Sequence, residues 1–519
     1  MSSDLRTLVD QYIESYRQLS TPVAVFAEAH ESQNEARIAT VREQLIPLST
    51  PGPGEQYAFE VNLDSCTGCK ACVSACHSLN GLDDEEAWRD VGLIFGGSSE
   101  APYQQTVTSA CHHCADPGCL NGCPVLAYEK DPISGIVRHL DDQCIGCQYC
   151  VLKCPYDVPK YNSRLGIVRK CDMCHQRLAV GEAPACAQAC PTHAIRIVKV
   201  PLVHSEMGGP SVPVDKFLPA APDASLTGPS TRYVSKHSIP ENARAADLAT
   251  LRPQQLHGPL VLMLTLTQAG YGLLLGNWLH DAPFPTSVPA MTGLGLILAG
   301  LIASAAHLGQ PLRMWRVFLN LRRSWLSREA VILGLSFGLL NLAATSAYVN
   351  ALSAFSPVLL AAGLLTGLLG VVCSAMIYID TGRYFWNAPS TLLKMGGTLA
   401  LFATTLLMPP AAGLLLLCKL LLEMTVLLEL RNSLSRKSQS ARLIIGPLRG
   451  LALLRLGIGL LASGLLIAEC LPQTFTLPLL ALLLCGELAE RALFFRAVDS
   501  SKMPGMPATA TPDASATTH

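Results

Sequence analysis

The sequence has few charged residues, few aromatic residues and almost no net charge. Only 15% of its 519 residues are charged, and the formal net charge is −1. Soluble globular chains carry about 25% charged residues, so we expect part of this chain to lie in a membrane. The charge balance gives no support to nucleic-acid binding, which requires a basic surface. The 50% hydrophobic content excludes disorder throughout the chain.

The N-terminus lacks the apolar core of a secretory signal peptide and lacks a twin-arginine pair. The apolar residues of the first twenty positions share one helical face: Leu5, Leu8, Val9, Tyr12, Tyr16 and Leu19. We expect an amphipathic helix that covers either a partner protein or another part of this chain.

Cysteine is abundant and unevenly placed. Sixteen of the twenty cysteines lie between Cys66 and Cys190. The other four stand singly in apolar runs and are interpreted as small hydrophobic residues: Cys373, Cys418, Cys470 and Cys485. Together with composition, this distribution predicts an N-terminal helical extension (1–56), a cluster-binding domain (57–200), a Pro/Ser/Gly-rich linker (201–256), a membrane bundle (257–498) and a disordered tail (499–519).

The sixteen cysteines form four motifs. In chain order these are Cys66, Cys69, Cys72 and Cys76; Cys111, Cys114, Cys119 and Cys123; Cys144, Cys147, Cys150 and Cys154; and Cys171, Cys174, Cys186 and Cys190. Cysteines at C-x2-C-x2-C spacing can hold three corners of a cubane cluster, and a trailing cysteine followed by proline ligates the other cluster of a pair. Proline follows the last cysteine in three motifs. The spacing therefore predicts four iron–sulfur clusters in two ferredoxin-like pairs.

Two other uses of cysteine fit less well. Disulfide frameworks are typical of small secreted chains. Structural zinc sites take four ligands from two C-x2-C pairs, without repeated triplets. Basic residues interleaved with the motifs would offset cluster charge or simply face solvent, and for each one we favour the solvent interpretation: Lys70, Lys130, Arg138, Lys153, Lys160, Arg169, Lys170 and Arg177.

Residues 57–200 resemble the four-cluster electron-transfer subunits of the dimethyl sulfoxide reductase family of molybdenum-dependent oxidoreductases. CTGCKAC, CHHCADPGC, CIGCQYCVLKCPYDVPKY and CDMC followed by ACAQACP carry the resemblance. It implies four [4Fe–4S] clusters, because all sixteen ligand positions are cysteine here. It also implies four ligand sets: Cys66, Cys69, Cys72 and Cys190; Cys171, Cys174, Cys186 and Cys76; Cys111, Cys114, Cys119 and Cys154; and Cys144, Cys147, Cys150 and Cys123.

The C-terminal half contains apolar runs long enough to cross a bilayer, which takes about 20 residues each. Eight spans are predicted, near 258–279, 286–306, 330–350, 357–379, 392–408, 411–430, 450–470 and 477–497. The fold class is therefore an α+β dicluster ferredoxin-like domain fused to an all-α bundle of about eight transmembrane helices. Loops on the cluster side carry twelve Lys and Arg residues, and HDAPFPT and NALSAFS opposite carry none. The positive-inside rule then places the cluster domain in the cytoplasm, at a bacterial inner membrane.

The bundle resembles the membrane anchor of the same family, so the chain looks like a fusion of two subunits. The stretch HLGQPLRMWRVFLNLRRSWLSRE carries this resemblance and implies a menaquinol site at His307 and Glu329, with Arg313 as a lesser candidate. Quinol oxidation releases two protons, and a histidine and a carboxylate are suitable acceptors. The alternatives are that His307 is an ordinary interface histidine, that Glu329 caps a helix, and that Arg313 only sets topology. His257, before the first span, is a weaker candidate than these three.

Several charged residues fall inside the predicted spans: Lys419, Glu423, Glu429, Arg455, Glu487, Glu490 and Arg491. Intramembrane charges are costly and often mark functional paths. Lys419 with Glu423, and Glu487 with Arg491, stand four residues apart and can pair along one helix. We therefore favour structural pairing over a proton path.

These features predict an electron-transfer and anchor polypeptide that links membrane quinone to a separate molybdopterin-containing catalytic subunit. The resemblance leaves the terminal substrate and the direction of electron flow open. An anchor without quinone chemistry and a redox-driven proton pump are the rival hypotheses. A pump needs a continuous polar path across the bundle, and the far side has little charge.

Overall fold

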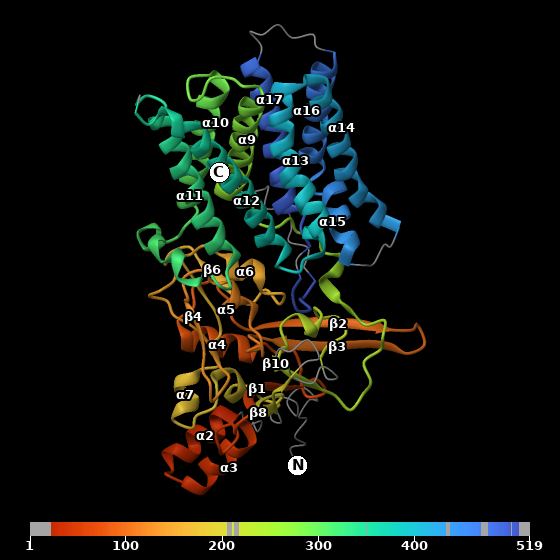
Figure 1. The fold of residues 1–519 in the computed structure, drawn as a ribbon. Helices are drawn as coiled ribbons and strands as arrows, with labels where there is room; N and C mark the ends of the chain where they lie inside the picture. Colours follow the sequence, from red (N-terminus) through yellow and green to blue (C-terminus); the bar gives the residue numbers. More distant parts are fainter. Residues whose placement is uncertain are drawn as a thin grey trace, which may run out of the picture.

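The computed structural model describes residues 22–204, 210–211, 217–349, 351–431, 436–468, 476–499 and 501–507. A mixed α/β part lies at one end of the molecule, and a bundle of long helices lies at the other (Figure 1). The predicted amphipathic helix of the first twenty residues lies outside the described residues, as does Cys470.

The α/β part is built from small sheets rather than one large one. A three-stranded sheet has the order β11-β1-β8, a second has the order β12-β2-β3, and β4-β5, β6-β7 and β9-β10 form ribbons. The strands are β1 (Glu55–Asn62), β2 (Asp90–Gly97), β3 (Pro102–Ser109), β4 (Tyr128–Lys130), β5 (Val137–His139), β6 (Lys160–Asn162), β7 (Ile167–Arg169), β8 (Ile195–Pro201), β9 (Val203–His204), β10 (Pro210–Ser211), β11 (Arg232–Val234) and β12 (Arg244–Ala245).

Short helices alternate with these strands and carry many of the cysteines. They are α2 (Pro22–Glu31), α3 (Glu35–Leu45), α4 (Ala71–Asn80), α5 (Gly118–Gly122), α6 (Tyr149–Lys153), α7 (His175–Ala179) and α8 (Ala185–Gln188). Helices α2 and α3 lie at the end of this part farthest from the bundle (Figure 1).

The first and third cysteine motifs curl through two left-handed residues each. Gly68 and Gly146 have φ of +73° and +69°, and Lys70 and Gln148 two positions later have φ of +62° and +59°. Glycine adopts this conformation without steric cost. The tight curl brings the cysteines on either side of each left-handed residue close together.

Residues 217–249, expected to belong to an extended linker, pack against the cluster-binding domain instead, and Leu251 and Gln254 contact the helical bundle. β11 pairs in parallel with β1, and β12 pairs with β2. Tyr233 is buried in the same core as Phe59. The composition hid this arrangement because these short strands pair with distant ones and have no period of their own.

The chain also returns to the α/β part after its last long helix. Met503 is buried in the core of that part, and the Leu93 amide donates to the Gly505 carbonyl at 3.4 Å. Residues 501–507 thus belong to a packed segment, although the sequence suggests a disordered tail from 499 onward. Residues 508–519 lie outside the described residues.

Among the described residues, the bundle contains eight long helices and one short one. They are α9 (Gly258–Leu279), α10 (Val288–Ala306), α11 (Trp325–Ser346), α12 (Ser356–Ile379), α13 (Ala388–Leu407), α14 (Pro409–Met424), α15 (Arg436–Ile445), α16 (Arg449–Ile467) and α17 (Thr476–Arg496). The 3-10 segments that join them include η4 (Pro311–Asn320) and η7 (Thr425–Arg431). Helix α9 is central and contacts α10, α12, α13 and α17.

Seven of the helical segments in the described part of the chain are long and apolar enough to cross a membrane. The predicted spans match them to within a few residues, and the first match is exact at 258–279. The eighth predicted span corresponds to α17, which carries Glu487, Glu490, Arg491 and Arg496. Its crossing of the membrane stays a prediction.

Glycine allows close approach between neighbouring helices. A Cβ at Gly270 would lie 2.6 Å from the Gly293 carbonyl oxygen, and one at Gly367 would lie 2.1 Å from the Tyr271 ring. Small residues of this kind are typical of helix contacts in membranes, where backbone proximity supplies the packing energy.

Candidate cluster and membrane sites

The structure brings the first cysteine motif together with the end of the fourth. Cys66, Cys69, Cys72 and Cys190, here called quartet 1, line one cavity. The second motif meets the end of the third in the same way. Cys111, Cys114, Cys119 and Cys154, called quartet 3, line another cavity.

The remaining cysteines form two further groups. Quartet 2 is Cys171, Cys174, Cys186 and Cys76, and quartet 4 is Cys144, Cys147, Cys150 and Cys123. Burial raises the pKa of Cys76 to about 12, and repulsion from Cys186 and Cys174 adds to the rise. Burial, followed by repulsion from Cys123 and Cys144, raises the pKa of Cys147. These sulfurs are therefore near neighbours, and a bound metal would be needed to hold them as thiolates.

The quartets follow one another in a row. Quartets 1 and 2 are neighbours, because Cys186 adds to the burial that raises the pKa of Cys72. Quartets 2 and 3 are neighbours, because Cys111 adds to the burial that raises the pKa of Cys171. Tyr128 lies between quartets 3 and 4, because Cys150 and Cys119 both contribute after burial to raising its pKa. The order along the molecule is thus 1, 2, 3, 4.

Hydrogen-bond donors face several sulfurs. The Gly146 and Met173 amides approach Cys144 and Cys171 Sγ, each at 3.4 Å. The Thr227 hydroxyl donates to Cys114 Sγ at 3.3 Å. Such bonds stabilise thiolates and tune cluster potentials. Thr227 was not predicted, because it comes from the stretch that the sequence assigns to a linker.

The geometry of the cysteines suits clusters better than single ions. In the described part of the chain, no group of three or more His, Cys, Asp or Glu side chains is close enough to hold one metal ion. The cysteines of quartets 1 and 3 instead surround cavities, as ligands of a multi-atom cluster do. The donor set is also all sulfur, which is the set that iron–sulfur clusters use.

The segment after α10 packs directly on the third cysteine motif. A Cβ at Gly146 would lie 2.3 Å from the Gly166 carbonyl and 2.9 Å from Gly309 Cα, so only glycine permits this contact. The Gln310 amide donates to the Ile145 carbonyl at 3.0 Å. Arg313 donates to the Asp141 and Cys144 carbonyls, each at 3.2 Å. Arg313 therefore contacts the cluster-binding loop itself.

A second set of contacts joins η4 and α11 to the second motif. Asn320 donates to the Cys123 carbonyl at 2.8 Å, and Ser324 to the Gly122 carbonyl at 2.7 Å. Tyr149 of α6 donates to the Ile377 carbonyl at 3.1 Å, at the end of α12. Quartet 4 is therefore the group of cysteines that touches the bundle.

His307 ends α10 at this junction. Its ring lies 5.5 Å from the His257 ring, edge to face, and its Nε2 is buried with no hydrogen-bond partner among the described residues. Burial lowers the pKa of His307, and a hydrogen bond with the Cys147 backbone opposes that effect. Burial, aided by His307 and Arg383, lowers the pKa of His257 to about 4. The sequence makes His257 only a weak candidate, and its place beside His307 depends on helix packing that the sequence does not show.

Glu329 lies in the first turns of α11, next to α12. Its side chain is buried, and the Ser374 hydroxyl donates to its Oε1. The structure thus places His307 and Arg313 on the third cysteine motif and Glu329 inside the bundle beside α12.

Charged residues of α14, α16 and α17 form ion pairs between helices, so the expected i+4 pairs Lys419–Glu423 and Glu487–Arg491 are wrong. Lys419 pairs with Glu487 of α17. Arg455 binds both Glu423 oxygens, at 3.0 and 2.7 Å, and reaches Glu487 at 3.1 Å. Packing puts these side chains closer to facing helices than to their i+4 neighbours. Arg491 donates to Gln268 of α9 at 2.9 Å.

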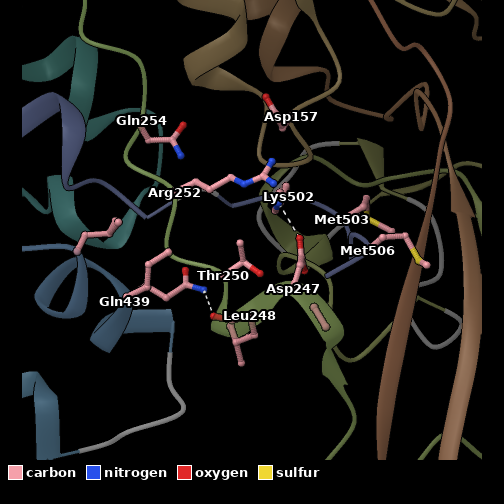
Figure 2. Close-up of a pocket in the computed structure, with 13 residues that line it drawn as sticks. Asp157, Asp247, Leu248, Thr250, Arg252, Gln254, Gln439, Lys502, Met503 and Met506 are labelled. Carbon is pink, nitrogen blue, oxygen red and sulfur yellow. Dashed lines mark hydrogen bonds and ion pairs between the residues drawn. The ribbon is translucent and has the colours of Figure 1, made fainter. Parts of the chain in front are cut away.

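A cavity lies where residues 245–254, α15 and the C-terminal segment meet (Figure 2). Lys502 pairs with Asp247 at 2.7 Å, and Gln439 donates to the Leu248 carbonyl at 3.1 Å (Figure 2). The sixteen motif cysteines, His307, Glu329 and Arg313, which the structure describes, do not line it. It is a junction between the two parts of the chain, separate from the predicted sites.

Comparisons with known proteins agree with this architecture. Residues 103–200 match the family described as a 4Fe-4S dicluster domain, and residues 287–496 match the DMSO reductase anchor subunit (DmsC). The chain is 35% identical over 163 residues to the B subunit of the anaerobic dimethyl sulfoxide reductase from Haemophilus influenzae, covering 30% of this chain and 79% of that protein. The chain belongs to the dimethyl sulfoxide reductase family.

Further relatives match stretches of similar length. The B subunit of the Escherichia coli K12 anaerobic dimethyl sulfoxide reductase is 38% identical over 148 residues, 27% of this chain and 72% of that protein. The E. coli K12 formate dehydrogenase-O iron-sulfur subunit is 34% identical over 189 residues, 32% of this chain and 61% of that protein. This family member is a multi-pass membrane protein in which an iron–sulfur electron-transfer subunit is fused to a DmsC-type anchor.

Proposed function

We propose that this chain transfers electrons between a membrane quinone and a separate molybdopterin-containing catalytic subunit through four [4Fe–4S] clusters. The observation that carries the proposal is the packing of the segment after His307 on the cysteine loop of quartet 4. This packing supports a quinone site close to the cluster of quartet 4, with no other domain between the two.

Each quartet would hold one cluster, with quartet 4 nearest the bundle and quartet 1 farthest from it. The clusters supply one-electron steps. The polypeptide fixes their spacing through the tight motif loops, and the amide and hydroxyl donors described above stabilise the sulfur ligands. The exposed position of Cys69 in quartet 1 supports an exit toward a partner protein at that end.

At the membrane end, His307 and Glu329 handle the quinone head group and its protons. The free Nε2 of His307 can accept from a quinol hydroxyl or donate to a quinone carbonyl, depending on its tautomer. Glu329, held by one serine hydroxyl, is a candidate acceptor for a released proton. Arg313 positions the cluster loop through two carbonyls and holds the junction together.

The quinone site is tested in the complex isolated with its partner subunit. Reduction of the clusters by a menaquinol analogue is followed by EPR in wild type, His307→Gln and the control His280→Gln. His280 is exposed at the opposite end of α9. We expect the quinol-driven rate to fall at least ~100-fold in His307→Gln, with dithionite reduction unchanged. An unaltered quinol rate would remove His307 from the site.

Cluster number and orientation need their own measurements. Four clusters require about 16 iron atoms per chain, and a clearly lower iron content would contradict the proposal. The arginine-rich loops beside the cluster domain favour a cytoplasmic location. Protease added to sealed right-side-out bacterial vesicles should leave the cluster domain intact, whereas inverted vesicles should lose it.

A further inference from the structure

Two cations are buried among the cysteine quartets. Lys170 is 3% exposed and Arg89 is 2% exposed. Lysine and arginine are almost never buried to this degree unless they face a compensating negative charge. The solvent interpretation that the sequence favours for Lys170 therefore does not hold, and Arg89 belongs to none of the sequence motifs.

Lys170 lies between quartets 2 and 3. It precedes Cys171 of quartet 2 and lines the cavity formed by quartet 3. Its Nζ donates to the Cys171 carbonyl at 2.8 Å and to the Val137 carbonyl. These two bonds hold the ammonium in place beside Cys171 of quartet 2 and at the cavity that Cys111 and Cys119 of quartet 3 also line.

Arg89 lies between quartets 1 and 2. Its Nη1 donates to the Thr108 hydroxyl at 3.1 Å, and that hydroxyl is 3.6 Å from Cys72 Sγ. Its guanidinium lies 4.6 Å from the centre of the Phe59 ring. Its Nη2 is buried without a hydrogen-bond partner in the part of the chain that the structure describes. The cysteines that attract it most are Cys186, Cys72, Cys171 and Cys76, from both quartets.

The two cations converge on quartet 2. Reducing a cluster adds one negative charge to a site that already carries four thiolates. A fixed positive charge in a poorly solvated interior stabilises that extra electron far more than a charge in water would. Quartet 2 faces Lys170 on one side and Arg89 on the other, whereas quartet 3 faces Lys170 and quartet 1 faces Arg89.

We propose that Lys170 and Arg89 are positioning residues that raise the reduction potential of the quartet 2 cluster, so that electrons pass between the two cluster pairs. The clusters held by quartets 3, 2 and 1 would exchange single electrons, in either direction, with no bond made or broken. The inference rests on the proposed function, since it requires clusters in these quartets.

Potentiometric titration of the purified complex, followed by EPR, tests the proposal. In Lys170→Met we expect the equilibrium constant for reducing the quartet 2 cluster to fall at least tenfold, which is about 59 mV for a one-electron couple. The quartet 3 cluster should shift in the same direction. In Arg89→Met the shift should appear at quartets 2 and 1. The quartet 4 cluster should change less than twofold in both.

Lys130 provides a matched control. Its Nζ also donates to two carbonyls, those of Cys114 and Ala115, at 3.0 and 2.9 Å, but the side chain is partly exposed. Solvent screening should limit the shift in Lys130→Met to less than about threefold. Lys170→Arg keeps the charge and should restore potentials close to those of wild type.

Each outcome decides the matter. Unchanged potentials in Lys170→Met and Arg89→Met, or equal shifts of all four clusters, would overturn the proposal. Loss of iron in both variants would assign the two cations to cluster assembly and also overturn it. The wild-type protein separates this inference from the proposed function. If wild type holds fewer than four clusters, the proposed function fails. If it holds four clusters whose potentials do not change in the two variants, only the inference fails.

Discussion

The two halves of the membrane bundle treat buried polar groups differently. In the half formed by α13–α17, Lys419, Glu487, Arg455 and Glu423 form a continuous set of ion pairs between helices. In the half formed by α9–α12, Glu329 has one hydroxyl donor, and His307 keeps a buried nitrogen without a partner among the described residues. A charge that is already paired has little capacity left for a ligand. The contrast suggests that the α13–α17 charges hold helices together and that the α9–α12 groups bind substrate.

The largest effect is expected at Glu487, which faces both Lys419 and Arg455. Glu487→Gln keeps the shape and removes the charge, leaving two buried cations without their shared partner. Breaking such a buried pair costs about 3–5 kcal/mol. We expect a loss of that size in the free energy of unfolding, measured by denaturation in detergent. The quinol-driven rate per folded molecule should stay within twofold of wild type; a large drop in that rate would break the contrast.

Glu329→Gln should do the opposite. The amide can still accept from Ser374, so the free energy of unfolding should change by less than about 1 kcal/mol. Loss of a proton acceptor should slow quinol-driven cluster reduction by at least ~100-fold. Stopped-flow reduction and thermal denaturation of the same preparation check both parts. A destabilised protein with a normal rate would make Glu329 a structural residue.

A double-mutant cycle sharpens the comparison within the α13–α17 half. Replacing Lys419 and Glu487 together by methionine removes both charges of the pair, so the double variant should lose less stability than the two single changes summed. Groups in direct contact couple by about 0.5–3 kcal/mol. Additive losses would show that the ion pair does not stabilise the bundle.

Some of these features could be predicted from the sequence, and others could not. Cysteine motifs and spans are local patterns, so spacing and apolar length are enough to place them. Arg89 belongs to no motif, and its cysteine neighbours come from the first and fourth motifs, which only the fold brings together. The pairing of Lys419 failed for a related reason: a partner four residues away is visible in the sequence, whereas Glu487 becomes its neighbour only when α14 packs near α17. Residues 217–256 resemble a linker in the sequence because the short strands there have no local pattern. Each strand is stabilised by a partner that is distant along the chain.

Glu490 tests the comparison most finely, although Arg491 beside it also has buried nitrogens without a hydrogen-bond partner among the described residues. It is buried in α17, yet neither carboxylate oxygen has a hydrogen-bond partner within the described residues, and Arg491 approaches it only to 3.4 Å. If incomplete pairing alone marked a functional group, Glu490→Gln would slow quinol oxidation as Glu329→Gln does. Glu490 is, however, absent from the junction with quartet 4, and we expect Glu490→Gln to leave the rate unchanged. Neutralising it removes the desolvation cost of a buried carboxylate but also its attraction to Arg491, and these opposing effects should keep the free energy of unfolding within about 1 kcal/mol of wild type. The same stopped-flow and denaturation measurements apply. A slowed rate with normal stability would show that a residue can act in quinol oxidation without lying at the quartet 4 loop. The α13–α17 half would then take part in quinone chemistry.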